Sequence, residues 1–262
     1  MATALPARQA GSVPERTLVV LRYSPWSERA RWVLDHHHLS YRTLQHEPFL
    51  GERRLRRLSG KRTGRVTVPI LLLPGEVLTD SWDIALYADR EGASEKLIPA
   101  EGQEEIRHLT ELADRAMEQN RALFVARLLG SGAALDETLP AWVPRVTRPL
   151  LRPVTRFATG WFGRKYEVTL DQSEAQKQFL RGTLLDFRRR LADGVYLLDR
   201  FSYADIALAT FLQGISPVYD RYIALGPASR EVWTQPELAR EFDDLVRWRD
   251  RLYAEKRGPA SG

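Results

Sequence analysis

The sequence contains no cysteine. Without a protein thiol there can be no disulfide bond, no zinc–thiolate site and no mixed disulfide between the protein and a substrate. Enzymes that work through a reactive cysteine of their own are therefore excluded.

Long apolar runs are also missing. The runs at residues 18–21 and 70–73 fall far short of the ~20 apolar residues that a membrane-spanning helix needs. Residues 1–16 lack the continuous apolar stretch of a secretory signal, and we expect them to form a flexible tail. These observations favour a cytoplasmic protein.

Neither sign of charge dominates the chain. The sequence has 39 basic and 34 acidic side chains, for a net charge of +5. Its densest basic cluster, residues 53–65, contains none of the aromatic side chains that usually accompany basic residues at a nucleic-acid interface. We therefore interpret this cluster as a solvated face and do not expect nucleic acid as a partner.

Histidine is scarce as well, and three of the five histidines are consecutive, at residues 36–38. Consecutive side chains on a helix point in different directions, so these three cannot share one metal ion. We expect them to form an exposed helix end and predict no metal site.

The first third of the sequence alternates short apolar strands with helical spacing. The chain is long enough for two domains, and the predicted order of the first is β-α-β-α-β-β-α. Strands are predicted at residues 18–22, 41–44, 66–73 and 77–78, and the clearest helices at 27–37 and 82–90. Parallel pairing followed by a hairpin is the layout of an α/β thioredoxin-like domain, which we assign to residues 17–92.

Residues 93–103 are rich in Gly, Ala, Ser, Pro and Glu, and we interpret them as a linker. Apolar residues then recur at helical spacing, which predicts an all-α helical-bundle domain over residues 104–262. Its predicted helices span residues 104–129, 173–191, 203–213 and 236–256.

Three motifs, in order, resemble the glutathione S-transferase (GST) superfamily, in particular its serine-type, theta- and zeta-like classes. They are S-P-W-S-E-R-A-R at 24–31, T-V-P-I-L at 67–71 with T-D-S-W-D-I-A-L-Y at 79–87, and F-S-Y-A-D-I-A at 201–207. The resemblance covers about residues 17–255, with 130–172 poorly matched. It implies the GST fold, with glutathione as co-substrate in the first domain, an electrophile pocket in the second, and a homodimer.

The serines of the first motif suit the activation of a thiol. A free thiol with a pKa of about 8.5 is only about 3% thiolate at pH 7, and lowering that pKa by about two units takes about 2.7 kcal/mol. A hydroxyl that donates to an anion supplies roughly 1.5–3 kcal/mol, and a helix N-terminus roughly 0.3–1 kcal/mol. The resemblance places Ser24 opposite the glutathione sulfur. Tyr23 and Ser27 are possible alternates, although Ser27 is also a natural helix cap.

The second motif provides candidate glutathione-binding residues. Pro69 interrupts an apolar strand, which is typical of an edge strand or a turn. The resemblance implies a cis Val68–Pro69 bond, with the Val68 backbone facing the cysteinyl backbone of glutathione. Ser81, with the first amides of its helix, suits the γ-glutamyl carboxylate, and Asp80 suits the α-ammonium.

The third motif is structural. Ser202 and Asp205 form a capping box, with Phe201 and Ile206 placed as its hydrophobic staple.

The electrophile pocket is less defined. We name Trp26, Arg121 and Phe124 as possible members. The segment 140–165 departs from the family because its prolines, Pro144, Pro149 and Pro153, interrupt any regular helix. Its arginines at 145, 148, 152 and 156 form a helical stripe. We interpret the segment as a broken helical insertion with its arginines in water; a lid over the pocket and a membrane-surface anchor are the alternatives.

The expected function is conjugation of glutathione thiolate to a small, apolar electrophile, as in detoxification. One alternative is a non-catalytic interaction module with the same fold, which would not need Ser24, Pro69, Asp80 and Ser81 together. Glutathione-dependent dehalogenation and ether cleavage would use the same site and are further alternatives for the function.

Overall fold

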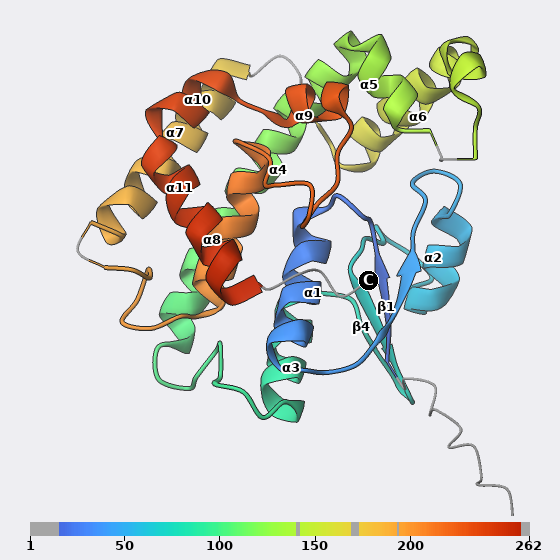
Figure 1. The fold of residues 1–262 in the computed structure, drawn as a ribbon. Helices are drawn as coiled ribbons and strands as arrows, with labels where there is room; N and C mark the ends of the chain where they lie inside the picture. Colours follow the sequence, from blue (N-terminus) through green and yellow to red (C-terminus); the bar gives the residue numbers. More distant parts are fainter. Residues whose placement is uncertain (1–15, 140–141, 169–172, 193, 258–262) are drawn as a thin grey trace, which may run out of the picture.

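The computed structural model describes residues 16–139, 142–168, 173–192 and 194–257. Nearly all of the predicted tail, and residues 140–141 of the proline-rich segment, lie outside this range. A small sheet with flanking helices packs against a larger group of helices (Figure 1). None of the described helices is long and apolar enough to cross a membrane.

The N-terminal part confirms the predicted α/β thioredoxin-like order. Its elements are β1 (Thr17–Val20), α1 (Pro25–His36), β2 (Arg42–Gln45), α2 (Glu52–Ser59), β3 (Ile70–Leu73), β4 (Glu76–Leu78) and α3 (Ser81–Glu91). The strands lie in the order β2-β1-β3-β4. Strand β1 is parallel to β2 and antiparallel to β3, which forms a hairpin with β4.

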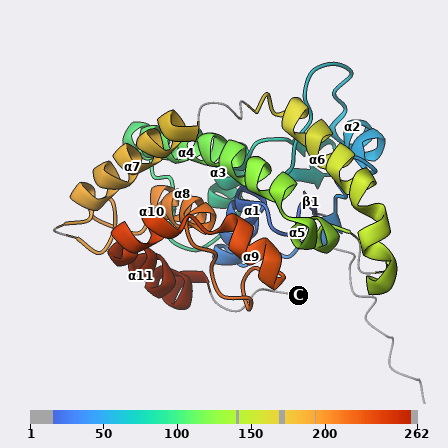
Figure 2. The same ribbon diagram turned by 90° about the horizontal axis from the view of Figure 1, so that it is seen from above.

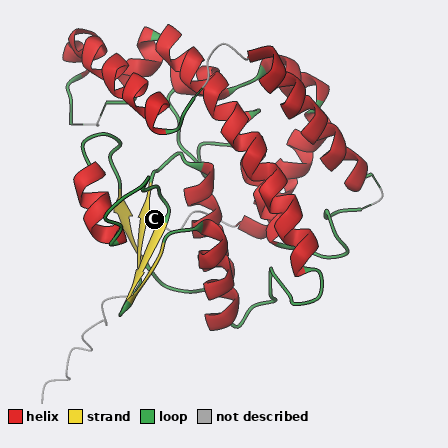
Figure 3. Ribbon diagram, turned by 180° about the vertical axis from the view of Figure 1, so that it is seen from behind, coloured by secondary structure: helices red, strands yellow, loops and turns green. Residues whose placement is uncertain are grey.

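Successive side chains of β1 point to opposite faces of the sheet, and both faces are covered by helices. Leu18 and Val20 pack in the main core with α1 and α3, whereas Val19 packs against Leu55 of α2. Successive side chains of a strand point to opposite faces, so three apolar residues in a row require helices on both sides. Figure 3 shows α2 on one side of the sheet and the helices of the main core on the other.

Strand β3 is shorter than the predicted 66–73 and begins only at Ile70. The preceding Val68–Pro69 bond is cis, as expected. Proline also has no N–H to donate to a neighbouring strand. Val66 to Pro69 therefore form a loop that leads into β3, which is an inner strand and not an edge strand.

The C-terminal part is helical, as predicted. Its α-helices are α4 (Gln103–Gly130), α5 (Gly132–Glu137), α6 (Arg152–Lys165), α7 (Ser173–Arg190), α8 (Tyr203–Phe211), α9 (Pro227–Trp233), α10 (Pro236–Glu241) and α11 (Asp243–Leu252). Short 3-10 helices span Arg145–Leu151 and Leu212–Gly214, and a π turn spans Tyr253–Arg257. The helix predicted at 236–256 is therefore divided, with Phe242 between α10 and α11. The domain boundaries at 92 and 104 stay a prediction.

Helix α8 is buried along its whole length and is the centre of the helical part. The predicted capping box is present at its start. The Asp205 carboxylate accepts hydrogen bonds from Leu197 N (2.8 Å), Ser202 N (2.8 Å) and Ser202 Oγ (3.0 Å). Burial still raises the pKa of Asp205 to about 6, so these three bonds offset only part of the cost of burying the charge.

The prediction of a broken helix at 140–165 is wrong in part. Helix α6 is regular over 14 residues because Pro153 lies in its first turn, where no N–H is needed. The arginines are not all in water either. Arg152 donates to both carboxylate oxygens of Asp136 at 3.0 and 2.7 Å, and Arg148 donates to the Val143 carbonyl at 3.1 Å.

The expectation of an exposed histidine run is wrong for His37, which is 3% exposed. Its Nε2 lies 2.7 Å from Oδ1 of Asp89. The same carboxylate accepts hydrogen bonds from Leu97 N (3.0 Å) and Ile98 N (2.6 Å). His37 and Asp89 thus fasten the segment between α3 and α4 to the end of α1. The Asp89 carboxylate is fully engaged in this way, whereas Nδ1 of His37 is buried without a partner among the described residues.

Replacing Asp205 by alanine would leave three buried donors without an acceptor. We expect Asp205→Ala to lower the free energy of unfolding by about 2–3 kcal/mol, measured by urea denaturation. The matched control is Asp199→Ala, an exposed position close by, which should change it by less than about 0.5 kcal/mol. Equal effects of the two substitutions would contradict a structural role for the capping box.

Candidate functional site

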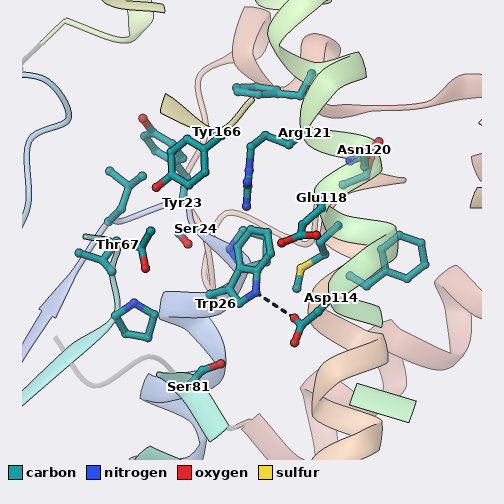
Figure 4. A pocket seen from close by; sticks show the side chains of 18 of the residues that line it. Tyr23, Ser24, Trp26, Thr67, Ser81, Asp114, Glu118, Asn120, Arg121 and Tyr166 are labelled. Carbon is teal, nitrogen blue, oxygen red and sulfur yellow. Dashed lines mark hydrogen bonds between the residues drawn. The ribbon is translucent and has the colours of Figure 1, made fainter. Parts of the chain in front are cut away.

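A cavity of about 290 Å³ lies between the sheet and helix α4 (Figure 4). Its walls come from the start of α1, the loop before β3, the start of α3, and helices α4, α6 and α9. Nine of the ten residues proposed from the sequence line it: Tyr23, Ser24, Trp26, Val68, Pro69, Asp80, Ser81, Arg121 and Phe124. Ser27 is the exception.

Ser24 is the N-cap of α1. Its Oγ accepts a long hydrogen bond, 3.4 Å, from Ser27 N. This bond uses a lone pair of Oγ and leaves its proton free. Within the described part of the chain the Ser24 hydroxyl donates to no acceptor, so capping the helix and donating to an anion in the cavity are compatible.

Ser27 is fully buried, and its Oγ accepts a hydrogen bond from Leu21 N at 3.1 Å. It therefore fastens the residue after β1 to the first turn of α1. Because Ser27 does not line the cavity, we do not propose it as a catalytic residue.

Tyr23 does line the cavity, beside Ser24 (Figure 4). Burial, together with the nearby charge of Glu47, raises the pKa of Tyr23 to about 12. The phenol is therefore protonated at neutral pH, where it can donate a hydrogen bond but cannot act as a base. Tyr23 stays an alternate to Ser24.

The proposed glutathione-binding residues lie on the sheet side of the cavity. None of the hydrogen bonds among the described residues involves the Val68 backbone, which precedes β3. Asp80 is the N-cap of α3, and its Oδ1 accepts from Trp82 N at 2.7 Å. Ser81 is the first residue of that helix and is 6% exposed. This wall thus offers a free peptide edge and a helix N-terminus to a ligand.

Two polar residues that sequence analysis missed hold the other wall in place. Asp114 of α4 accepts from Trp26 Nε1 at 2.9 Å (Figure 4) and from Arg29 Nη1 at 2.6 Å. Arg29 is fully buried and also donates to Thr210 Oγ1 (2.9 Å) and to the Ala207 carbonyl (3.2 Å), both on α8. One carboxylate therefore positions a ring of the cavity and joins α1 to α4.

Arg121 lies between two aromatic rings. Its guanidinium carbon is 4.7 Å from the ring centroid of Trp26 and 4.1 Å from that of Tyr166, as Figure 4 shows. Burial lowers the pKa of Arg121, but a guanidinium stays charged at neutral pH. Arg121 thus makes cation–π contacts with both rings.

The cavity-lining residues of α4 that sequence analysis missed had a visible signal. Residues 114, 117 and 118, which were missed, line the cavity with the predicted residues 121 and 124, and the five recur along the helix at a spacing that keeps them on one face. A helix face that mixes Asp, Glu and Arg with apolar residues is unusual for a core and indicates a lined cavity. Trp233 of α9 and Tyr166, which follows α6, gave no such signal.

The end of α6 lies over the cavity, to which it contributes Phe162, with Tyr166 directly following the helix. The helix is fastened to the region of α2: Lys165 Nζ lies 2.8 and 2.7 Å from the two carboxylate oxygens of Glu52. Phe49 packs against Phe157 and Trp161, with ring centroids 5.9 and 5.6 Å apart. Figure 2 shows α6 beside α2. This placement favours the interpretation of the segment as a lid.

Among the described residues no group of three or more Asp, Glu or His side chains is placed to hold a metal ion.

Comparison with known proteins supports the resemblance. Residues 23–91 match the family model of the glutathione S-transferase N-terminal domain. No curated protein sequence matches the chain. A glutathione S-transferase of Methylobacterium radiotolerans, in complex with glutathione sulfonate, is 18% identical, with 94% of this chain and 96% of that chain covered and a TM-score of 0.59.

Two further solved structures are similar. A glutathione S-transferase of Methylobacillus flagellatus with glutathione bound is 18% identical over 91% of this chain and 94% of that chain, with a TM-score of 0.56. The β-etherase LigF of Sphingobium sp. strain SYK-6 is 16% identical over 92% and 96%, with a TM-score of 0.61. The predicted GST fold and the resemblance to the superfamily are thus confirmed; the serine-type assignment stays a prediction.

The ion pair between α6 and α2 can be tested by hydrogen exchange. A hydrogen bond between charged groups contributes roughly 1.5–3 kcal/mol, so Lys165→Met should speed amide exchange in residues 152–165 by about tenfold or more. The control is Arg164→Met, an exposed neighbour on the same helix that should leave the rates unchanged. Unchanged protection of these amides from exchange in Lys165→Met would show that aromatic packing alone holds α6 against the region of α2.

Proposed function

We propose that this protein, which has the GST fold, is a glutathione transferase in which Ser24 stabilises the glutathione thiolate. One observation carries the proposal. The structure brings the hydroxyl of Ser24, whose proton is free, into one cavity with the Val68–Pro69 peptide and the Asp80–Ser81 helix start. These three segments are far apart in the sequence, and each offers a group that suits a different part of glutathione.

Glutathione would lie along the sheet side of the cavity. The Val68 amide and carbonyl would pair with the cysteinyl backbone in the manner of an added strand. Ser81 and the first amides of α3 would bind the γ-glutamyl carboxylate, and Asp80 the α-ammonium. The two similar transferases bind glutathione or glutathione sulfonate, which supports glutathione as the co-substrate here. No metal is part of this proposal.

The reaction would begin with loss of the thiol proton to solvent. The thiolate then attacks an electrophilic carbon, the S–C bond forms, and a leaving group departs with the electron pair of the bond that breaks. The Ser24 hydroxyl donates to the sulfur and favours the anion, and the N-terminus of α1 adds to this effect. Since the chain has no cysteine, the only thiol in the site is that of the substrate.

The electrophile would occupy the side lined by Trp26, Phe124 and Trp233, whose rings suit an apolar body. Dehalogenation and ether cleavage differ from this reaction only in the leaving group. A homodimer and a cytoplasmic location, both implied by the sequence, stay predictions.

Ser24→Ala should remove one hydrogen bond to the thiolate and raise the pKa of bound glutathione by roughly one to two units. Ultraviolet titration of the bound thiolate measures this directly. Activity should fall at neutral pH, and the loss should shrink as pH rises, because hydroxide then produces the thiolate that the enzyme no longer favours. Binding of glutathione should survive, since its other contacts are intact.

Two further variants make the test specific. Ser27→Ala should lower stability and leave the thiolate pKa in place, because Ser27 lies outside the cavity. Tyr23→Phe should change the pKa less than Ser24→Ala. If Tyr23→Phe raises the pKa and Ser24→Ala does not, Tyr23 is the residue that faces the sulfur.

A thermal-shift titration separates the enzyme from a non-catalytic interaction module. Glutathione at about 100 times its dissociation constant should stabilise the protein by about 2.7 kcal/mol, which raises Tm by about 5–10 °C for a chain of this size. Cysteinylglycine, which lacks the γ-glutamyl group, should have little effect at the same concentration. A folded protein with no shift in tens of millimolar glutathione would favour the interaction module.

A further inference from the structure

The guanidinium of Arg121 has unused hydrogen-bonding capacity in the cavity. It lies over the rings of Trp26 and Tyr166, and cation–π contacts leave the in-plane N–H groups available to an acceptor. None of the hydrogen bonds or ion pairs of the described residues involves Arg121. A partly buried guanidinium that has lost water and gained no acceptor is costly unless a ligand supplies one.

The other charged side chains of the cavity do not fill this role. Asp114 is already bonded to Arg29 and Trp26. Glu118, one turn before Arg121 on α4, is exposed; its charge favours the charged form of Arg121, but it forms no hydrogen bond or ion pair with it. Asp80 lies at the start of α3, and Arg65 is a second cation. A negatively charged ligand group is therefore the missing partner.

The side chains around Arg121 indicate what the rest of that ligand is like. Phe124, Phe162 and Trp233 line the cavity together with the two rings that contact the guanidinium. Aromatic walls around one cation suit a flat, conjugated molecule with an acidic group at its edge. Ser24 lies on the opposite side of Trp26 from the body of α4, within the same cavity (Figure 4).

We propose that Arg121 binds the carboxylate or sulfonate of an aromatic electrophile and so directs its reactive carbon toward the thiolate at Ser24. The proposal rests on the proposed function and adds the substrate class, an aryl acid, to it. The guanidinium of Arg121 would donate hydrogen bonds to both oxygens of the acid in one plane, while the rings of Trp26 and Tyr166 limit how the guanidinium can turn.

A second source of the same chemistry is glutathione itself, whose glycine carboxylate is also an anion. Arg121 belongs to α4 and faces the proposed electrophile side, whereas Val68 and Ser81 lie on the sheet side. Arg65, which lines the cavity three residues before Val68, is another cation that could meet the glycine end. The experiment below distinguishes the two ligands.

The test compares a chlorodinitrobenzoate, with its carboxylate para to the chlorine, and the methyl ester of the same compound. In both, the S–C bond forms, the C–Cl bond breaks and chloride leaves. After correction for the uncatalysed rates, wild type should show a kcat/KM at least tenfold higher for the acid. Arg121→Gln should lower kcat/KM for the acid by about 10- to 100-fold and for the ester by less than about threefold.

Arg115→Gln is the matched control, since Arg115 is an exposed arginine of the same helix that does not line the cavity. It should change neither substrate. Equal losses on acid and ester in Arg121→Gln would show that the guanidinium only supports the two rings. A loss of glutathione affinity in Arg121→Gln with an unchanged acid-to-ester ratio would assign Arg121 to the glycine carboxylate. Either result overturns the proposal.

A binding measurement keeps the inference separate from the proposed function. Calorimetry with 3,5-dinitrobenzoate, which has no leaving group, and its methyl ester needs neither glutathione nor turnover. Wild type should bind the acid at least tenfold more tightly, and Arg121→Gln should abolish the difference. If wild type fails to bind glutathione but shows this preference, the transferase proposal fails and the anion site stands. If it binds glutathione but shows no preference, the anion site fails alone.

Discussion

The buried guanidinium of Arg29 joins the two halves of this protein at the site. It donates to Asp114 on α4 and to Thr210 and the Ala207 carbonyl on α8. Removing Asp114, the one carboxylate among these partners, would leave a buried charge without compensation, which costs several kcal/mol. Helices α1, α4 and α8 are therefore restricted to one arrangement. Because α1 begins at the Ser24 cap, that arrangement also sets where the proposed catalytic hydroxyl lies relative to α4.

The fold could be predicted largely from the sequence, because the decisive signals are local. Apolar alternation and helical spacing predicted the order of helices and strands. The capping box at Ser202 and Asp205 predicted the start of a helix from four residues alone. Pro69 indicated a break in a strand, although the strand proved to begin only after it. Which residues line the candidate cavity was predictable to a similar degree. Many of them lie at the ends of helices and strands, where a serine before a helix or a proline in a strand stands out from the surrounding pattern.

What could not be predicted are the long-range polar pairs. The sequence motif that includes Arg29 was visible, but nothing local indicates that its partner is Asp114, 85 residues away. His37 and Asp89 are a similar case, since a histidine at a helix end is ordinarily exposed. Hydrophobic periodicity shows which face of a helix is buried, but it does not show which charged residues are buried with it. Tyr166 was missed for another reason, as it follows a segment with no counterpart in the family pattern.

The double use of Asp114 has an evolutionary consequence. One carboxylate both neutralises Arg29 at the junction of the helices and orients the indole of Trp26, which in turn makes a cation–π contact with Arg121. A change at Thr210, far inside α8, would alter the bonding of Arg29 and be transmitted through Asp114 to that indole. Substitutions at positions that touch no ligand could thus change the substrate selectivity of this protein during evolution. The residues that contact the ligand would stay the same.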